Sequence, residues 1–152
     1  MLRERLTAEM KEAMKAGDKA KLATVRLIQA ALKDRDIEAR GLGKEPLAED
    51  EILALLQKMI KQRNESAAVY EQGGRPELAA GERAEVAVIE TFLPRQMDEA
   101  ETRAAIQAAI AETGAAGPKE MGKVIAALKS RYAGRMDFAK ASGLVKGMLA
   151  GG

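Results

Sequence analysis

Apolar residues recur at intervals of three and four along nearly the whole chain, and this spacing constrains the fold more than any other feature. At 100° per residue, one face of a helix over residues 52–70 would carry Ile52, Leu56, Met59, Ile60, Arg63, Ala67 and Tyr70. Residues that favour helices dominate, and the runs of β-branched residues that favour strands are absent. The sequence therefore predicts an all-α fold with an aliphatic core.

Glycine and proline divide this helical pattern into two sets of helices. Four are expected at about residues 2–16, 18–40, 49–72 and 76–91, and three at about residues 98–113, 118–132 and 137–149. Pro94 should separate the sets, because the residue before a proline avoids the helical conformation. The predicted domains are an amino-terminal four-helix part at residues 1–93, a hinge at 94–97, and a carboxyl-terminal three-helix module at 98–150. Residues 150–152 should be frayed.

The chain contains neither cysteine nor histidine. This excludes disulfides, thiolate metal sites, cysteine nucleophiles and the imidazole that most often serves as general base or transition-metal ligand. The glycines also match no phosphate-binding loop. We therefore predict no catalytic residue, no metal and no other cofactor.

Nothing in the sequence indicates a membrane partner. No apolar run approaches the roughly 20 residues of a membrane span. The amphipathic start of the chain mixes acidic and basic residues, which suits neither a secretory signal nor a transit peptide. A cytoplasmic location is therefore expected.

Basic residues gather near the end of the chain. The formal net charge is only +2, but residues from Gly117 onward carry seven basic and two acidic side chains. On a helix beginning at Pro118, Lys119 and Lys123 lie opposite the apolar stripe and should face solvent. Such a surface could contact the phosphate backbone of a nucleic acid, although lysine-rich outer faces are also common on small soluble helices. The candidate RNA-binding residues are Lys119, Lys123, Lys129, Arg131, Arg135, Lys140 and Lys146.

An arginine and two glutamates occupy positions within apolar stripes. Arg63 lies in the third predicted helix, and Glu82 and Glu85 lie in the fourth, which a double-glycine turn should make its antiparallel neighbour. A buried arginine needs acceptors, so these three residues are predicted to form an ion cluster that fixes the register of the two helices. The alternative is an acid/base pair beside an anion-binding arginine. That alternative lacks a nucleophile, a metal cluster and a phosphate loop.

Three stretches of the chain resemble one known family. They are VRLIQAALKDRDIEARG, KQRNESAAVYEQGGRPELAAGERAEVAVIETFLPRQ and KEMGKVIAALKSRYAGRMDFAKASGLVKGML. Together they look like the GatB/YqeY family, specifically its free-standing YqeY-like proteins, over essentially the whole chain. The resemblance implies the two-part helical layout, with a carboxyl-terminal module similar to the tail domain of the B subunit of glutamyl/aspartyl-tRNA amidotransferase. That tail helps to hold tRNA, while the amide chemistry takes place elsewhere.

For this chain the resemblance implies a tRNA-binding accessory protein that is not catalytic by itself. The alternative is a protein–protein module whose amino-terminal helices dock on an aminoacyl-tRNA synthetase or an amidotransferase. A third reading is the family label of carbon–nitrogen ligase activity with glutamine as amide donor, for which the residues provide no physical support.

The best-marked tail positions of the family fall on Met121-Gly122-Lys123-Val124 and on the turn from Ala133 to Asp137. Ala133 stands where the resemblance implies a lysine, which removes one possible phosphate contact, and Arg135 is the residue expected to compensate. Gly122 lies inside a predicted helix, where glycine costs about 0.5–1 kcal/mol relative to alanine. Its expected role is to allow the close approach of another helix, with the backbone of a ligand as the alternative.

Overall fold

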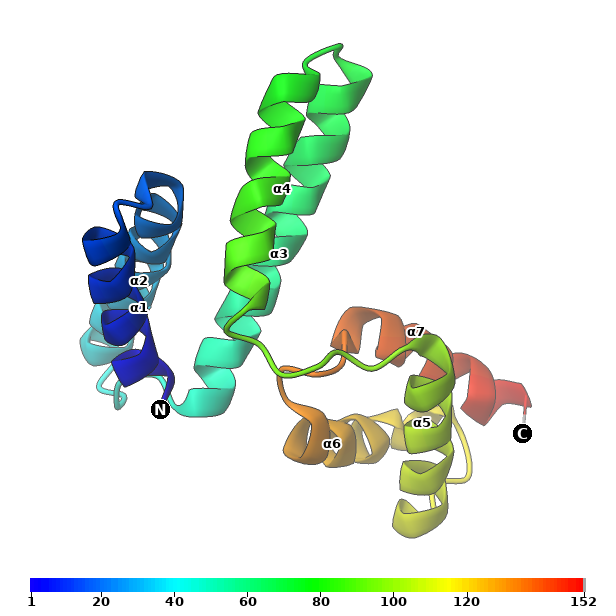
Figure 1. Ribbon diagram of the computed structural model, residues 1–152. Coiled ribbons are helices and arrows are strands. Elements are labelled where there is room, and N and C mark those ends of the chain that lie inside the picture. Colours follow the sequence, from blue (N-terminus) through cyan, green and yellow to red (C-terminus); the bar gives the residue numbers. More distant parts are fainter. Residues whose placement is uncertain (152) are drawn as a thin grey trace. The chain divides into compact units, whose positions relative to one another are not determined.

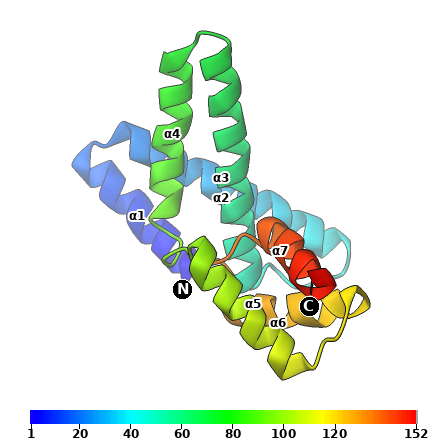
Figure 2. The ribbon, with the colours of Figure 1, turned by 90° about the vertical axis from the view of Figure 1, so that its right-hand side faces the viewer.

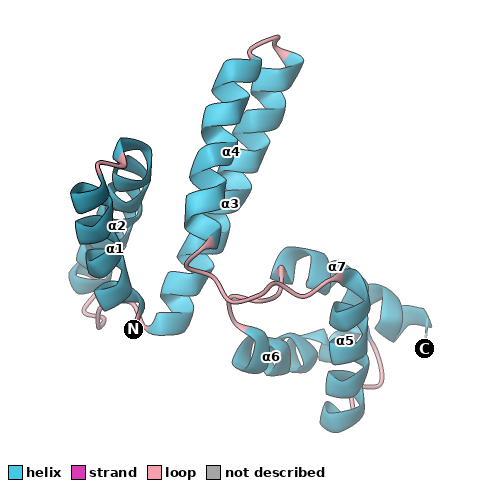
Figure 3. Cartoon of the chain, viewed as in Figure 1, coloured by secondary structure: helices cyan, strands magenta, loops and turns pink. Residues whose placement is uncertain are grey.

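The computed structural model describes residues 1–151, and every regular element in that range is helical (Figure 3). The all-α prediction is therefore confirmed. The helices are α1 (Leu2–Ala16), α2 (Lys19–Gly41), α3 (Glu49–Gln72), α4 (Pro76–Glu90), α5 (Glu99–Thr113), the short 3-10 helix η1 (Pro118–Glu120), α6 (Met121–Tyr132) and α7 (Phe138–Gly151). None of these helices is long and apolar enough to cross a membrane. The end predicted to be frayed covers residues 150–152. Helix α7 extends to Gly151, and Gly152 lies outside the described residues.

Contacts between residues divide the chain into two compact units. Unit 1 covers Met1–Leu93 and contains α1 to α4, and unit 2 begins at Pro94 and contains α5 to α7. In unit 1, α3 and α4 lie side by side as an antiparallel pair (Figure 1, Figure 2). Gly74, in the connection between them, has a φ angle of 73°, which glycine adopts without steric cost.

A single aliphatic core ties the four helices of unit 1 together. Leu6 of α1, Ile28 of α2, Leu56 of α3 and Ile89 of α4 are almost completely buried, and Phe92 joins them after the end of α4. Full burial of a side chain of this size contributes about 1.5–3 kcal/mol. Each helix therefore depends on the others for most of its stability, as expected for short helices in water.

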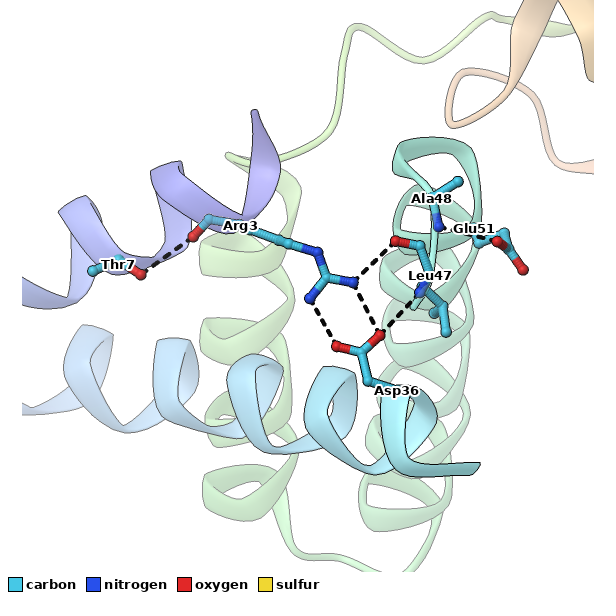
Figure 4. A network of polar contacts seen from close by, with 6 residues as sticks. All are labelled: Arg3, Thr7, Asp36, Leu47, Ala48 and Glu51. Carbon is cyan, nitrogen blue, oxygen red and sulfur yellow. Dashed lines mark hydrogen bonds and ion pairs between the residues drawn. The ribbon is translucent and has the colours of Figure 1, made fainter. Parts of the chain in front are cut away.

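A polar network fastens the loop before α3 to the α1–α2 pair (Figure 4). Arg3 Nη1 is 2.7 Å from Asp36 Oδ2, and Arg3 Nη2 is 2.9 Å from Asp36 Oδ1, so the two groups form a pair of parallel hydrogen bonds. Arg3 also donates to the carbonyl oxygen of Leu47, whose N–H donates to Asp36. The hydrogen bonds from Arg3 lower the pKa of Asp36. Three segments of unit 1 thus meet at one ion pair.

Unit 2 has a core of its own between α5, α6 and α7. Ile106, Val124, Leu128 and Val145 are fully buried, and Met136 closes this core from the turn before α7. The helix predicted at residues 118–132 begins with one 3-10 turn, η1, before it continues as α6. Such turns are frequent at the start of α-helices.

The turn between α6 and α7 is fastened to the segment that precedes α5. The N–H of Met97 donates to the carbonyl oxygen of Arg135 at 2.8 Å. The side-chain amide of Gln96 donates to the carbonyl oxygen of Gly134 at 2.5 Å. In return, Arg135 Nε donates to the carbonyl oxygen of Arg95 at 3.1 Å. The segment predicted as a hinge, residues 94–97, therefore belongs to unit 2 and is hydrogen-bonded to its turn between α6 and α7.

Candidate nucleic-acid interface

All seven cations predicted to contact RNA lie in unit 2. They are distributed over η1 (Lys119), α6 (Lys123, Lys129 and Arg131), the following turn (Arg135) and α7 (Lys140 and Lys146). Six of these residues are exposed, and Arg135 is half-buried. Exposure is not sufficient for a phosphate contact, because a cation already paired with a carboxylate adds little net charge to its surroundings. The partners of each cation therefore separate the candidates.

Arg131 is paired within unit 2. Its guanidinium forms an ion pair with Glu112, near the end of α5, and this hydrogen bond raises the pKa of Arg131. Both side chains remain about half exposed. Residues 98–116 carry four acidic and one basic side chain. An acidic helix thus packs against the basic helices of the same unit and neutralises one of their cations.

Arg135 is bound to the protein rather than free in solvent. Besides its hydrogen bond to the carbonyl oxygen of Arg95, its guanidinium lies 6.0 Å from the centre of the Tyr132 ring. Arg95 in turn donates two hydrogen bonds to Glu101, at 3.0 and 2.6 Å, and these lower the pKa of Glu101 to about 2. The cation expected to replace the missing lysine at position 133 therefore helps to hold the turn.

Lys140 shares a hollow with carboxylates. It lines a hollow of about 700 Å³ between the starts of α5 and α7, together with Asp98, Glu99 and Asp137. Asp98 caps α5 by accepting a hydrogen bond from the N–H of Glu101, and Asp137 accepts one from the N–H of Lys140. Because the lining carries more negative than positive charge, this hollow is a poor place for a phosphate group.

Lys119 and Lys123 lie one turn apart where η1 passes into α6, and both are exposed. Neither takes part in an ion pair within residues 1–151. Lys129 differs, since its ammonium group lies 6.0 Å from the centre of the Phe138 ring. Lys146, on α7, is exposed and likewise forms no ion pair within the described part of the chain. Among the seven candidates, the two open cations nearest each other in sequence are thus Lys119 and Lys123 at the start of α6.

The expectation that Gly122 allows another helix to pack closely is wrong. Gly122 is exposed, and a Cβ atom added at this position would meet no atom of another element within 4 Å. Its surroundings are open solvent. Packing inside unit 2 therefore does not explain why a helix carries glycine here.

In unit 1, Arg63 pairs with only one of the two glutamates predicted to surround it. Arg63 Nε donates to Glu85 Oε2 at 2.8 Å, and Nη1 donates to the carbonyl oxygen of Met59 at 3.2 Å. The side chains of Arg63 and Glu85 are 17% and 34% exposed, so the pair is largely covered. Glu82, three residues earlier on α4, forms no ion pair within residues 1–151, because the antiparallel register brings Glu85 level with Arg63. The predicted cluster is corrected to a pair.

The described residues contain no group of three or more acidic side chains arranged to hold a metal ion. The unpredicted contacts of unit 2 include the pairing of Arg131 with Glu112 and the anchoring of Gln96 on Gly134. The only sequence signal for the first was the excess of acidic residues in the preceding helix. Nothing in the sequence indicated the second.

Comparison with known proteins identifies the family to which the chain is similar. The family model described as Yqey-like protein matches residues 3–149. Two curated relatives carry the name altered inheritance of mitochondria protein 41, mitochondrial. The protein from Vanderwaltozyma polyspora is 31% identical over 88 residues, and that from Eremothecium gossypii is 30% identical over 88 residues. Each match covers 58% of this chain and 46% of the relative, so the chain spans less than half the length of these relatives.

The names of these two relatives assign them to mitochondria, so the cytoplasmic location expected for this chain stays a prediction. The family match covers nearly the entire sequence and does not depend on the shorter alignments. The chain belongs to the YqeY-like protein family.

Proposed function

We propose that this YqeY-like chain is an accessory protein that holds tRNA by its phosphate backbone and does not itself catalyse a reaction. The proposed contact is Lys119, Gly122 and Lys123, which we call the α6 start surface. One observation carries the proposal. Two exposed lysines without ion pairs lie one turn apart, and an exposed glycine that packs against nothing lies between them in the sequence.

The chemistry of this surface suits a phosphate. Two ammonium groups supply compact positive charges, and the partial positive charge at the start of a helix adds to them. A glycine presents bare backbone, so a phosphate could approach the helix more closely than a side chain would allow. No aromatic residue lies within the α6 start surface to stack on bases. The contact would therefore recognise shape and backbone rather than sequence.

The choice of tRNA rests on the family. The resemblance of the carboxyl-terminal part to the tail of a tRNA-dependent amidotransferase supports tRNA over other anions of similar charge density. Three of the other cations contribute less to this proposal. Arg131 is paired with Glu112, Arg135 holds the turn, and Lys140 lines a hollow together with three carboxylates.

The test is the affinity of the purified chain for tRNA, measured at several salt concentrations. Replacing both lysines, in the double variant Lys119→Ala/Lys123→Ala, should weaken binding by roughly tenfold at moderate salt. It should also flatten the dependence of log K on log salt by about 0.7–0.9 for each phosphate that the variant no longer neutralises.

The matched control is Arg103→Ala/Arg131→Ala, which removes the same charge from cations that are already paired with Glu99 and Glu112. This control should bind tRNA within about twofold of the parent, because cations that are paired with carboxylates neutralise few phosphates and so displace few counterions from the RNA. If the two double variants lose the same affinity for tRNA, the loss reflects net charge alone and the proposed contact is refuted. Parental affinity in the lysine variant would also refute it.

A further inference from the structure

One face of α2 carries apolar side chains into solvent. Leu27 is 44% exposed and Ile37 is 56% exposed, and Ala23 and Ala30 are exposed as well. At 100° per residue these four positions fall within roughly 80° of arc, so they form one strip along the helix. We call this strip the α2 ridge. It lies apart from the face of α2 that enters the core of unit 1.

A row of cations follows one edge of the α2 ridge. Arg26, Lys33 and Arg40 are spaced by seven residues, which brings them to nearly the same side of a helix, next to Ile37. All three are exposed, and none forms an ion pair within residues 1–151. Consecutive members lie about 10 Å apart along the helix axis at 1.5 Å per residue. The exposed apolar residues of the α2 ridge and a row of cations at seven-residue spacing thus lie next to each other on α2.

The other edge has the opposite charge. Asp34 falls within the arc of the ridge, and Glu38 lies just beyond its far side. Both residues are exposed. A surface with a row of cations along one flank, one carboxylate within the apolar strip and another just beyond its far side is poorly matched to a uniform polyanion, such as RNA or an anionic membrane. It also lacks aromatic side chains for stacking or for insertion into a lipid interface.

We propose that the α2 ridge docks an amphipathic helix of a partner protein, with acidic residues along one flank of its apolar stripe. The alanines permit close approach of two helices, Leu27 and Ile37 supply the apolar contact, and the cation row pairs with the acidic flank. The two flanks of unlike charge would fix the orientation of the bound helix. This interaction surface belongs to unit 1 and is independent of the proposed tRNA contact.

The first test uses two synthetic helical peptides of about 20 residues, a length sufficient to cover the ridge. Both have the same apolar stripe, and one flank carries glutamate in the first peptide and lysine in the second. The full chain should bind the glutamate peptide at least about tenfold more tightly than the lysine peptide, as measured by fluorescence anisotropy. The variant Arg26→Glu/Lys33→Glu/Arg40→Glu should reverse that preference.

Two further variants separate charge from apolar contact. The variant Leu27→Ser/Ile37→Ser should lower the affinity for both peptides by about tenfold and keep the preference for the glutamate peptide. The control Lys11→Glu/Lys44→Glu/Lys61→Glu changes the net charge equally at exposed cations elsewhere in unit 1, and it should keep the parental preference. Circular dichroism checks that each variant is folded. If the parent shows no preference, or if the control reverses it, the docking proposal fails.

The second test identifies the occupant in the cell. A photo-crosslinking residue at position 30 of the full chain should join to a helical segment of another protein that has one acidic flank. That crosslink should disappear when the three cations are reversed to glutamate. Crosslinks to nucleic acid, to lipid or to a second copy of the chain would overturn the proposal. A crosslink that persists after charge reversal would do the same.

Discussion

The side-chain amide of Gln96 donates a hydrogen bond to the carbonyl oxygen of Gly134 at 2.5 Å, across 38 residues of sequence. Beside it, the N–H of Met97 donates to the carbonyl oxygen of Arg135. Gly134 takes a left-handed conformation, with a φ angle of 78°, and it is buried, so its carbonyl needs a hydrogen-bond partner. The segment before α5 supplies that partner, and it thereby sets the path of the chain between α6 and α7.

Loss of this hydrogen bond should loosen the turn. We expect Gln96→Ala to lower the free energy of unfolding by about 0.5–1.5 kcal/mol and to speed hydrogen exchange at the N–H of Met97. Gln107→Ala, at an exposed position of α5, is the control and should change neither quantity. Unchanged exchange at Met97 in the first variant would contradict a role for Gln96 in holding the turn. Hydrogen exchange followed by mass spectrometry or NMR provides the measurement.

The ion pair of Arg3 and Asp36 should make the stability of unit 1 depend on pH. Hydrogen bonds from Arg3 lower the pKa of Asp36, so the ionised carboxylate stabilises the folded state above the unfolded pKa, which is about 3.9. That contribution is lost as the pH falls through the lowered folded pKa. Asp36→Asn should therefore reduce the free energy of unfolding at neutral pH by about 1–3 kcal/mol.

The pH dependence provides the check on this ion pair. The deficit of Asp36→Asn relative to the parent should shrink below about pH 4, because the parent then loses the same charge. Asp34→Asn is the control, since Asp34 is exposed and forms no ion pair within residues 1–151. Urea unfolding at several pH values measures both variants. A deficit that is constant down to the acid-unfolding region would show that charge at Asp36 is not the cause.

Apolar spacing, together with the positions of glycine and proline, was sufficient to predict most of the helices. The predicted ranges agree with α1 to α5 to within one or two residues, because glycine and proline end or begin most of those helices. The prediction differs from the structure at residues 118–120, which form the 3-10 turn η1 rather than the first turn of α6. A sequence does not distinguish the two, because a 3-10 turn and an α-helical turn have nearly the same pattern of residues. Helical periodicity also placed Lys119 and Lys123 on the solvent side.

Pairings between helices could not be predicted in the same way. The period places Glu82 and Glu85 on one face of α4, but only the register against α3 decides which of them meets Arg63. The same limit applies to Arg131, whose partner comes from α5, and to Arg135, whose partner is a backbone carbonyl. The prediction for Gly122 was wrong for a related reason, because a sequence does not reveal whether a helix face is covered.

The difference between the two glutamates on α4 can be measured directly. Glu85→Ala leaves the guanidinium of Arg63, which is 17% exposed, without its carboxylate partner and should lower the free energy of unfolding by about 1–3 kcal/mol. Glu82→Ala removes the same charge from the same helix and should change stability by less than about 0.5 kcal/mol. Urea unfolding of both variants supplies the comparison. Equal losses would mean that both carboxylates stabilise Arg63 in solution.

Gly122 distinguishes a binding role from a structural one, because the two roles predict opposite consequences of a methyl group. Alanine at this position meets open space and removes the conformational cost of a helical glycine, so Gly122→Ala should raise the free energy of unfolding by up to about 0.5–1 kcal/mol. If a phosphate backbone approaches here, the same methyl group should weaken tRNA binding by at least about threefold.

Gly81→Ala, at an exposed position of α4 with equally open surroundings, is the matched control. It should give a similar gain in stability and leave the affinity for tRNA unchanged. Thermal or urea unfolding and filter binding of the same preparations measure the two quantities together. Because Gly122→Ala is expected to be more stable than the parent, misfolding cannot account for a loss of affinity. If Gly122→Ala instead binds tRNA as tightly as the parent, the RNA backbone does not pass over this glycine, and the proposed role of Gly122 in the α6 start surface fails.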